Sequence, residues 1–312
     1  MTRSSLDTGV SPSLTADDLL ASVPGLAELD LGIAARTFRT LPGASLGFDD
    51  LYELAALIES LAADGVAGVV VTQGTDTLEE TAFFLDITVA AEIPVVITGA
   101  MRNPTLAGAD GPANVLAAIA VAASVAARKL GCVVVMSDEI HAARYVRKVH
   151  STSTAAFATP NAGPIGLVAE NRPRLLLRPP ARLVLPMASG SSPTVPVVPA
   201  SLGDDFAVLR PRRDDIDGLV VAAFGVGHVP ASAVDLLADY AAGVPVVLAT
   251  RTGAGVVHRA SYGFAGSESD LQDRGLINAG ILDAYKARVL LIRLLSIGAD
   301  RAEIARTFDG LG

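Results

Sequence analysis

The sequence predicts an α/β protein with two domains. Apolar runs at 66–71 and 94–98 have the length of strands buried on both faces, and a glycine turn and a helical segment follow each of them. This alternation is typical of parallel α/β sheets. A stretch dense in Pro, Ser and Gly, between about 186 and 203, separates two such series.

The domain boundaries follow from that composition. We expect an N-terminal domain at 1–190 with a mostly parallel sheet, a linker at 191–204, and a smaller C-terminal α/β domain at 205–312. The chain has 312 residues, of which 51% are apolar, so it can fill two cores.

The first half of the chain begins without an apolar run. Residues 1–13 contain neither the apolar region of a signal peptide nor a predicted strand. The first expected element is a helix from Thr15, whose Asp17 and Asp18 suit its positive end. A short strand at 35–40 and an amphipathic helix at 49–63 follow.

The stretch from Gly65 to Asp86 organises the rest of the chain. The strand at 66–71 ends in a turn with Thr75 and Asp76, and helical spacing begins at Leu78. Ligands bind at the carboxyl edge of open parallel sheets, so this turn is a candidate site. The alternative is that these residues only cap the helix, with Thr77 and Glu80 as a capping box or Asp76 and Glu79 as a second register of it.

Later elements repeat the pattern. We expect these further elements, all read from apolar periodicity: a strand at 94–98, an alanine-rich helix at 115–127, a strand at 131–137, an extended ribbon or loop around Lys148, strands at 206–210, 218–223 and 245–250, and helices at 232–242 and 286–297. The alanine-rich helix is too short to span a bilayer, which takes about 20 residues.

Composition excludes several classes of protein. A net charge of −9 and the lack of a basic run argue against a nucleic-acid partner. The single Cys132 permits no disulfide framework, and its apolar surroundings predict a small buried residue. No His, Cys or Asp spacing indicates a metal site, and we expect no membrane association and a cytoplasmic protein.

Three closely spaced strings carry a family resemblance. QGTDTLEETAFFLD, PVVITGAMRNP and GADGPANVLAA resemble the bacterial-type L-asparaginase/glutaminase family. The resemblance implies a two-domain asparaginase/glutaminase-like architecture and hydrolysis of the side-chain amide of L-asparagine to L-aspartate and ammonia through a threonine acyl-enzyme. It implies no cofactor and a homodimer or homotetramer. L-asparagine and L-glutamine differ by one methylene, which changes binding in a pocket by only about 1–3 kcal/mol, so the preference between them stays open.

The resemblance also assigns roles to residues. Thr75 and Lys148 handle the proton, Asp76 pairs with the substrate ammonium, and Gly74 lets the backbone approach. Ala100 offers its carbonyl to the substrate amide. Two further substrate-binding candidates are Ser45, in the loop where the family has a serine near Gly43, and Glu268, which would act from a neighbouring subunit. The ordinary alternatives are a solvated Lys148, a loop serine and a surface glutamate.

The family's first strand, which carries the nucleophilic threonine, has no match in this sequence. We therefore expect the 312-residue form to be poorly stable and to have little amidase activity, or Met1 to be an internal methionine. Two other classes stay open. One is a pseudoenzyme that binds an amino acid. The other is a nucleotide-binding α/β protein, which the missing third glycine of GVGH disfavours.

Overall fold

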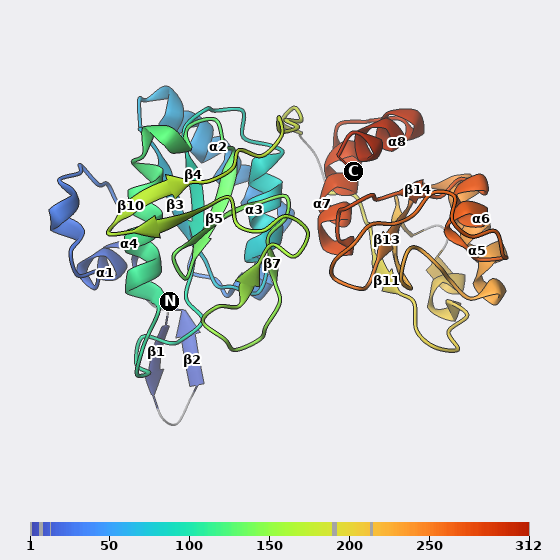
Figure 1. Ribbon diagram of the computed structural model, residues 1–312, viewed down its shortest axis with the longest axis horizontal. Helices are drawn as coiled ribbons and strands as arrows, with labels where there is room; N and C mark the ends of the chain where they lie inside the picture. Colours follow the sequence, from blue (N-terminus) through green and yellow to red (C-terminus); the bar gives the residue numbers. More distant parts are fainter. Residues whose placement is uncertain (1, 6–8, 13, 189–191, 213–214, 312) are drawn as a thin grey trace. The chain divides into compact units, whose positions relative to one another are not determined.

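The computed structural model describes residues 2–5, 9–12, 14–188, 192–212 and 215–311. The chain forms two compact units, which divide between Val184 and Leu185. Each unit contains a sheet with helices packed on it (Figure 1). The predicted fold class, two α/β units of which the first is the larger, is confirmed.

The first unit is built on a six-stranded sheet with the order β10-β9-β6-β5-β4-β3. Strands β3, β4 and β5 are parallel, and the other three extend the sheet in antiparallel pairing. The strands of this sheet are β3 (Val69–Thr72), β4 (Val95–Thr98), β5 (Cys132–Met136), β6 (Glu139–Ala142), β9 (Gly166–Ala169) and β10 (Arg172–Leu175).

Burial differs sharply between the central and outer strands of this sheet. Every residue of β4 and β5 is buried, as their runs of valine and isoleucine predict. Strand β3 is equally apolar, yet its three valines are only half-buried, because β3 lies at the edge of the sheet. Cys132 is buried, as its apolar surroundings predict.

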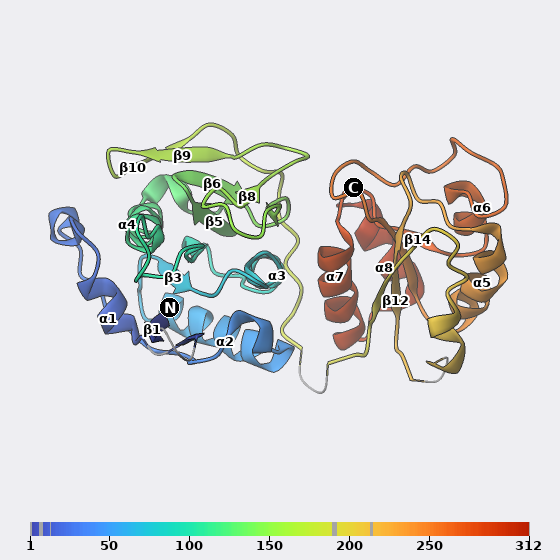
Figure 2. The same ribbon diagram turned by 90° about the horizontal axis from the view of Figure 1, so that it is seen from below.

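The helices of the first unit are α1 (Ala16–Ala21), α2 (Phe48–Ala63), α3 (Leu78–Asp86) and α4 (Gly111–Ala122). Helices α3 and α4 cover opposite faces of the sheet (Figures 1 and 2). Both connections step to the next strand in the same direction, from β3 to β4 and from β4 to β5. The two crossovers therefore have opposite hands, and one is left-handed, which is rare in parallel sheets.

The N-terminal segment departs from the prediction. Residues expected to contain no strand form a hairpin of β1 (Thr2–Ser5) and β2 (Gly9–Pro12). The two strands consist mostly of polar residues paired through their backbones, so the sequence has no apolar pattern that would predict them. The expected helix does begin after Thr15, whose hydroxyl accepts the Asp18 N–H in a capping box.

Another expected strand of the first unit, at 35–40, is absent from the described structure: this segment has no regular secondary structure. Its polar side chains serve neighbouring elements instead. The Thr37 hydroxyl accepts the Ala16 N–H, and Arg39 pairs with Asp50 and Glu53 of α2.

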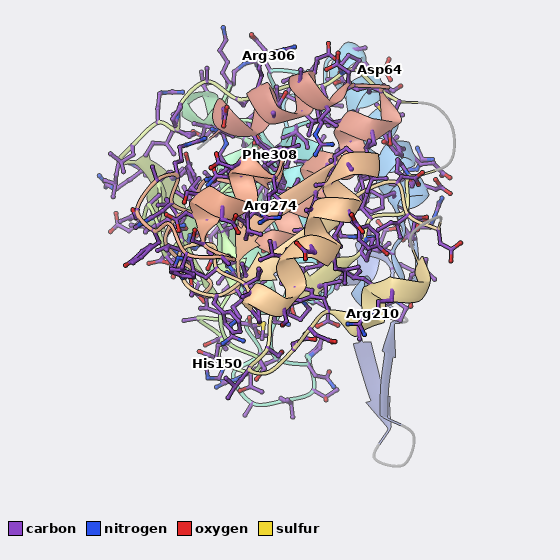
Figure 3. The ribbon with its side chains drawn as sticks, turned by 90° about the vertical axis from the view of Figure 1, so that its right-hand side faces the viewer. Asp64, His150, Arg210, Arg274, Arg306 and Phe308 are labelled. Atoms are coloured by element: carbon purple, nitrogen blue, oxygen red, sulfur yellow. The ribbon has the colours of Figure 1, made fainter. Side chains whose placement is uncertain are left out.

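The second unit has a four-stranded parallel sheet with the order β11-β12-β13-β14. Helices α5 and α7 lie on opposite faces of it (Figure 2). The elements are β11 (Val197–Pro199), β12 (Leu219–Ala223), β13 (Val246–Thr250), β14 (Ile277–Asn278), α5 (Val234–Gly243), α6 (Glu268–Asp273), α7 (Ala284–Ser296) and α8 (Arg301–Asp309). Arg274, labelled in Figure 3, joins α6 to α5 through Asp270 and Asp235.

Two predictions for the second unit are corrected. The expected linker at 191–204 contains β11, which pairs in parallel with β12. The strand expected at 206–210 is a 3-10 helix at Ala207–Arg212. Phe206 has a φ of 56°, outside the β region, and the side chains of Asp204 and Asp205 accept the N–H groups of Phe206 and Ala207. These aspartates fold the segment into a turn.

No helix among the described residues is both long and apolar enough to cross a membrane.

Candidate active site

The turn between β3 and α3 lies at the carboxyl edge of the first sheet. It packs against the loop 43–47 by backbone contact: a Cβ on Gly43 would lie 2.8 Å from the Gly74 carbonyl oxygen. The Thr77 hydroxyl donates to the Gly43 carbonyl at 2.9 Å and accepts from Gln73 Nε2 at 3.0 Å. Glycine at position 43 is therefore a steric requirement of the turn.

Three predicted site residues come together on this turn. Lys148 Nζ lies 2.9 Å from Thr75 Oγ1 and 3.2 Å from Asp76 Oδ1. Lys148 belongs to the short hairpin of β7 (Arg147–Lys148) and β8 (Phe157–Ala158), which is the extended ribbon that its sequence predicts. Its side chain is 18% exposed, whereas that of Asp76 is 66% exposed. The surface-lysine alternative is therefore wrong for Lys148.

The capping role expected of Thr77 is not realised. The Thr77 hydroxyl is directed to Gly43 and does not cap α3, and Glu79 accepts the backbone N–H of Lys148 at 2.6 Å. Glu79 is buried, and the sequence analysis gave it only a capping role with Asp76 at the helix start. The available signal was a charged residue in the first turn of a helix whose apolar residues, Leu78 and 82–85, predict burial on nearly every side.

Ala100 follows β4 at the same edge of the sheet and is half-buried. Asp110 anchors its loop by accepting the N–H groups of Met101 and Arg102, at 2.9 and 2.8 Å. Asn114, which sequence reasoning missed, donates to the Gly99 carbonyl and accepts the Ser137 N–H. The buried Asn114 amide thus ties the ends of β4 and β5 together, and Asn114 and Asp110 hold the backbone on the two sides of Ala100.

Ser45 closes the 3-10 turn Gly43–Ser45, in the loop that packs on Gly74. The residue is exposed, and its assignment as a substrate ligand stays a prediction. The close contact between Gly43 and Gly74 excludes a side chain at position 43, so Ser45 is the hydroxyl that this loop offers.

Glu268 lies in the second unit and is fully buried at the start of α6. Its Oε1 accepts the N–H groups of Ser261 and Tyr262, at 2.7 and 2.8 Å, and His228 Nε2 lies 3.1 Å from Oε2. Burial raises its pKa, but these hydrogen bonds outweigh burial and hold the pKa below the usual value. Glu268 is therefore not a surface glutamate. A contact between Glu268 and substrate bound to a neighbouring subunit stays a prediction.

Comparison with known proteins identifies the family. The model described as "Asparaginase, N-terminal" matches residues 1–181, and "Glutaminase/Asparaginase C-terminal domain" matches 194–308. The chain belongs to the asparaginase family. It is 40% identical to a probable L-asparaginase of Deinococcus radiodurans, over 86% of this chain and 83% of that protein.

Other members of the asparaginase family agree with this assignment. An L-asparaginase of Bacillus licheniformis is 36% identical over 88% of this chain and 87% of that protein. The crystal structure of a probable cytoplasmic L-asparaginase from Campylobacter jejuni matches with a TM-score of 0.86 at 32% identity, covering 94% of this chain and 93% of that one. The family resemblance read from the sequence is thus confirmed.

The described residues of this asparaginase-family chain contain no cluster of three or more His, Cys, Asp or Glu side chains arranged to hold a metal ion. The chemical groups assembled at the Thr75 turn are instead a hydroxyl, an ammonium and an exposed carboxylate. Such a set can move a proton to or from a hydroxyl and can bind a cationic group.

Proposed function

We propose that this protein is an amide hydrolase that converts L-asparagine to L-aspartate and ammonia. The observation that carries the proposal is the contact of 2.9 Å between Lys148 Nζ and Thr75 Oγ1 in a chain of the asparaginase family. Relatives that are 36–40% identical carry the name L-asparaginase, which supports the same substrate class.

The reaction passes through a threonine acyl-enzyme. A threonine hydroxyl attacks the side-chain amide carbon, its proton passes to the amide nitrogen, and ammonia leaves. Water then cleaves the ester, which releases L-aspartate and regenerates the hydroxyl. Thr75 and Lys148 carry the proton during these steps, because their direct contact gives a short path. Backbone N–H groups at the turn stabilise the charge that develops on the amide oxygen.

Substrate recognition uses the exposed side of the turn. The Asp76 carboxylate binds the substrate ammonium, and Gly74 lets the ligand approach the backbone. The Ala100 carbonyl accepts a hydrogen bond from the substrate amide. Ser45 is the candidate for the substrate carboxylate. The ratio of kcat/KM for L-asparagine and L-glutamine measures the preference that the sequence leaves open.

The test is ammonia release from L-asparagine by the wild-type chain and by Thr75→Ala and Lys148→Met. We expect turnover by the wild type and loss of it in both variants, with unchanged thermal unfolding. Trapping the acyl-enzyme and mapping it by mass spectrometry identifies the threonine that attacks. An active Lys148→Met variant would contradict the mechanism.

The second candidate function is amino-acid binding without efficient turnover. In the described part of the chain, the threonine hydroxyl within hydrogen-bond distance of Lys148 Nζ is that of Thr75 alone. A mechanism with separate attacking and relaying hydroxyls needs a second one. Calorimetric binding of L-aspartate together with no ammonia release would favour this candidate, and the same assay tests the weak activity expected from the sequence.

We further propose a homodimer or homotetramer in the cytoplasm. The support is the family membership together with the likeness to the Campylobacter jejuni structure, which is that of a probable cytoplasmic L-asparaginase. Light scattering on the purified chain measures the subunit number. A monomer with full activity would exclude any requirement for a residue such as Glu268 from a neighbouring subunit.

A further inference from the structure

Lys148 is held at two points by the segment that contains Thr75. Its ammonium contacts Thr75 and Asp76, and its backbone N–H donates to Glu79 Oε2 at 2.6 Å. All three partners lie within five consecutive residues, from the end of the β3 turn to the first turn of α3. The hydrogen bond to Glu79 thus links the backbone of β7 directly to this helix.

The hairpin that carries Lys148 has little regular structure to fix its position. Strands β7 and β8 are two residues long, and they form a separate two-stranded sheet, outside the six-stranded sheet that carries Thr75. The next residues, Val149 and His150, are exposed. A short ribbon outside the main sheet gains no register from it, so side-chain contacts, those of the buried Val146 and Phe157 beside Lys148 and that of Glu79, set the distance from Lys148 to Thr75.

Glu79 has the properties of such a contact. It is 8% exposed, it lies on an α3 whose residues are otherwise almost all buried, and a carboxylate that accepts a backbone N–H makes a strong charge-assisted bond. A buried carboxylate costs free energy to desolvate, so its place on a core helix needs a partner that compensates. The Lys148 N–H supplies part of that compensation.

We propose that Glu79 is a positioning residue that sets the distance between the Lys148 ammonium and the Thr75 hydroxyl. It acts through the backbone of Lys148. The proposal rests on the proposed function, because it assigns Glu79 a role in the turnover that Thr75 and Lys148 perform. A shift of about 1 Å in a reacting group can cost about 100-fold in rate, so loss of this bond affects kcat more than KM.

The first experiment compares Glu79→Ala with Glu79→Gln in ammonia release. We expect Glu79→Ala to lower kcat by about 10- to 100-fold with KM within about twofold. Glu79→Gln keeps an acceptor oxygen of the same reach, so it should restore kcat to within about threefold of wild type. If Glu79→Ala keeps wild-type kcat, or if Glu79→Gln is as slow as Glu79→Ala, the proposal is overturned.

A matched control separates positioning from general stability. Glu59 on α2 also accepts backbone N–H groups, from Ala90 and Ala91, away from the Thr75 turn. Glu59→Ala should lower the unfolding temperature and leave kcat unchanged. A similar loss of kcat in both alanine variants would mean that Glu79 acts only through stability, and this would overturn the proposal.

A second readout needs no substrate. The chain has three lysines, Lys129, Lys148 and Lys286, so labelling with 15N-lysine gives three backbone amide signals. Lys148→Arg assigns the signal of interest. In Glu79→Ala this amide should exchange with solvent about tenfold faster and shift, because it loses its acceptor, while Lys129 and Lys286 stay unchanged.

The two readouts distinguish failure of the proposed function from failure of the positioning role. If the wild type releases no ammonia, the proposed function fails, and the lysine signals alone decide whether Glu79 holds Lys148. If the wild type is active and the Lys148 signal is unchanged in Glu79→Ala, Glu79 does not hold this backbone, and the positioning role is overturned while the proposed function stands.

Discussion

The carboxyl edges of the two sheets carry similar groups in opposite environments. At the first edge, a lysine and an aspartate meet a threonine beside β3, and the aspartate is 66% exposed. At the second edge, beside β12, Glu268 is fully buried and bonded to two backbone N–H groups and to His228. The first edge keeps polar groups available to a ligand, and the second uses them to hold its own loop.

The aromatic rings of the second edge strengthen this difference. The His228 ring makes edge contacts with Tyr262 and Phe264, at centroid distances of 4.9 and 5.0 Å. These rings belong to the same loop whose N–H groups bind Glu268. The two edges therefore differ in exposure: the Asp76 carboxylate stays open to solvent, and the Glu268 carboxylate is bonded within its own loop.

The largest expected effect comes from removing the lysine of the first edge. Lys148→Met should lower kcat/KM for L-asparagine by about 10²–10⁴-fold, because proton transfer by a positioned side chain contributes that much. The unfolding temperature should change little, since the ion pair with an exposed aspartate contributes about 0–1 kcal/mol. Steady-state kinetics and a thermal scan check this, with Lys129→Met, an exposed lysine, as the control.

The next largest effect comes from removing the buried carboxylate of the second edge. Glu268→Ala should lower the free energy of unfolding by about 2–4 kcal/mol, because two backbone N–H groups lose their acceptor in a buried site. Denaturant titration measures it. An unchanged midpoint would show that the loop holds without Glu268. Unchanged binding of L-aspartate by Glu268→Ala, in a chain that stays folded, would leave Glu268 a structural role alone, whereas weaker binding would support its predicted contact with substrate.

Acidification tests the buried carboxylate of the second edge. The pKa of Glu268 is held below its usual value, so its contribution to stability is present above the pKa of an unfolded glutamate, about 4.3. That contribution is lost as the pH falls through the lower folded-state pKa. We expect the wild type to lose stability faster than Glu268→Gln below about pH 4. Equal slopes for the two chains would contradict this expectation.

Two buried groups of the first unit change stability with pH in opposite directions, and these changes should nearly cancel between about pH 4 and 6. Burial raises the pKa of Asp86 to about 6, so its contribution to stability falls as the pH rises through this range. Burial lowers the pKa of His141 to about 4, so its contribution rises with pH over the same range. Asp86→Asn should expose the His141 slope of about 1 kcal/mol per pH unit, measured by denaturant titration.

The last expected effect concerns recognition at the first edge. Asp76→Asn removes one charge-assisted contact, so it should raise the Kd for L-aspartate by about 10- to 100-fold. Calorimetric titration measures the Kd. Unchanged affinity would mean that the exposed carboxylate does not face the ligand, and the two edges would then differ less than their exposures indicate.

The sequence predicted the main features of the first edge because they are local. The strand, the glycine turn and the helix follow one another, and the resemblance supplied Lys148 from 73 residues away. Glu79 and Asn114 were missed because their partners lie on other elements, and a single sequence does not pair distant residues. The strand expected at 206–210 failed for a different reason: the side chains of the preceding aspartates fold the turn.

Strand β3 has a consequence for how the molecule behaves at high concentration. Among the described strands its backbone borders one neighbour, β4, and its valines stay half-buried on an edge without a lysine or proline to protect it. Such an edge can accept a further strand from another polypeptide. A strand added in parallel would end beside Gly74 and Thr75, so self-association through this edge would block or reshape the site, and dilution would restore it.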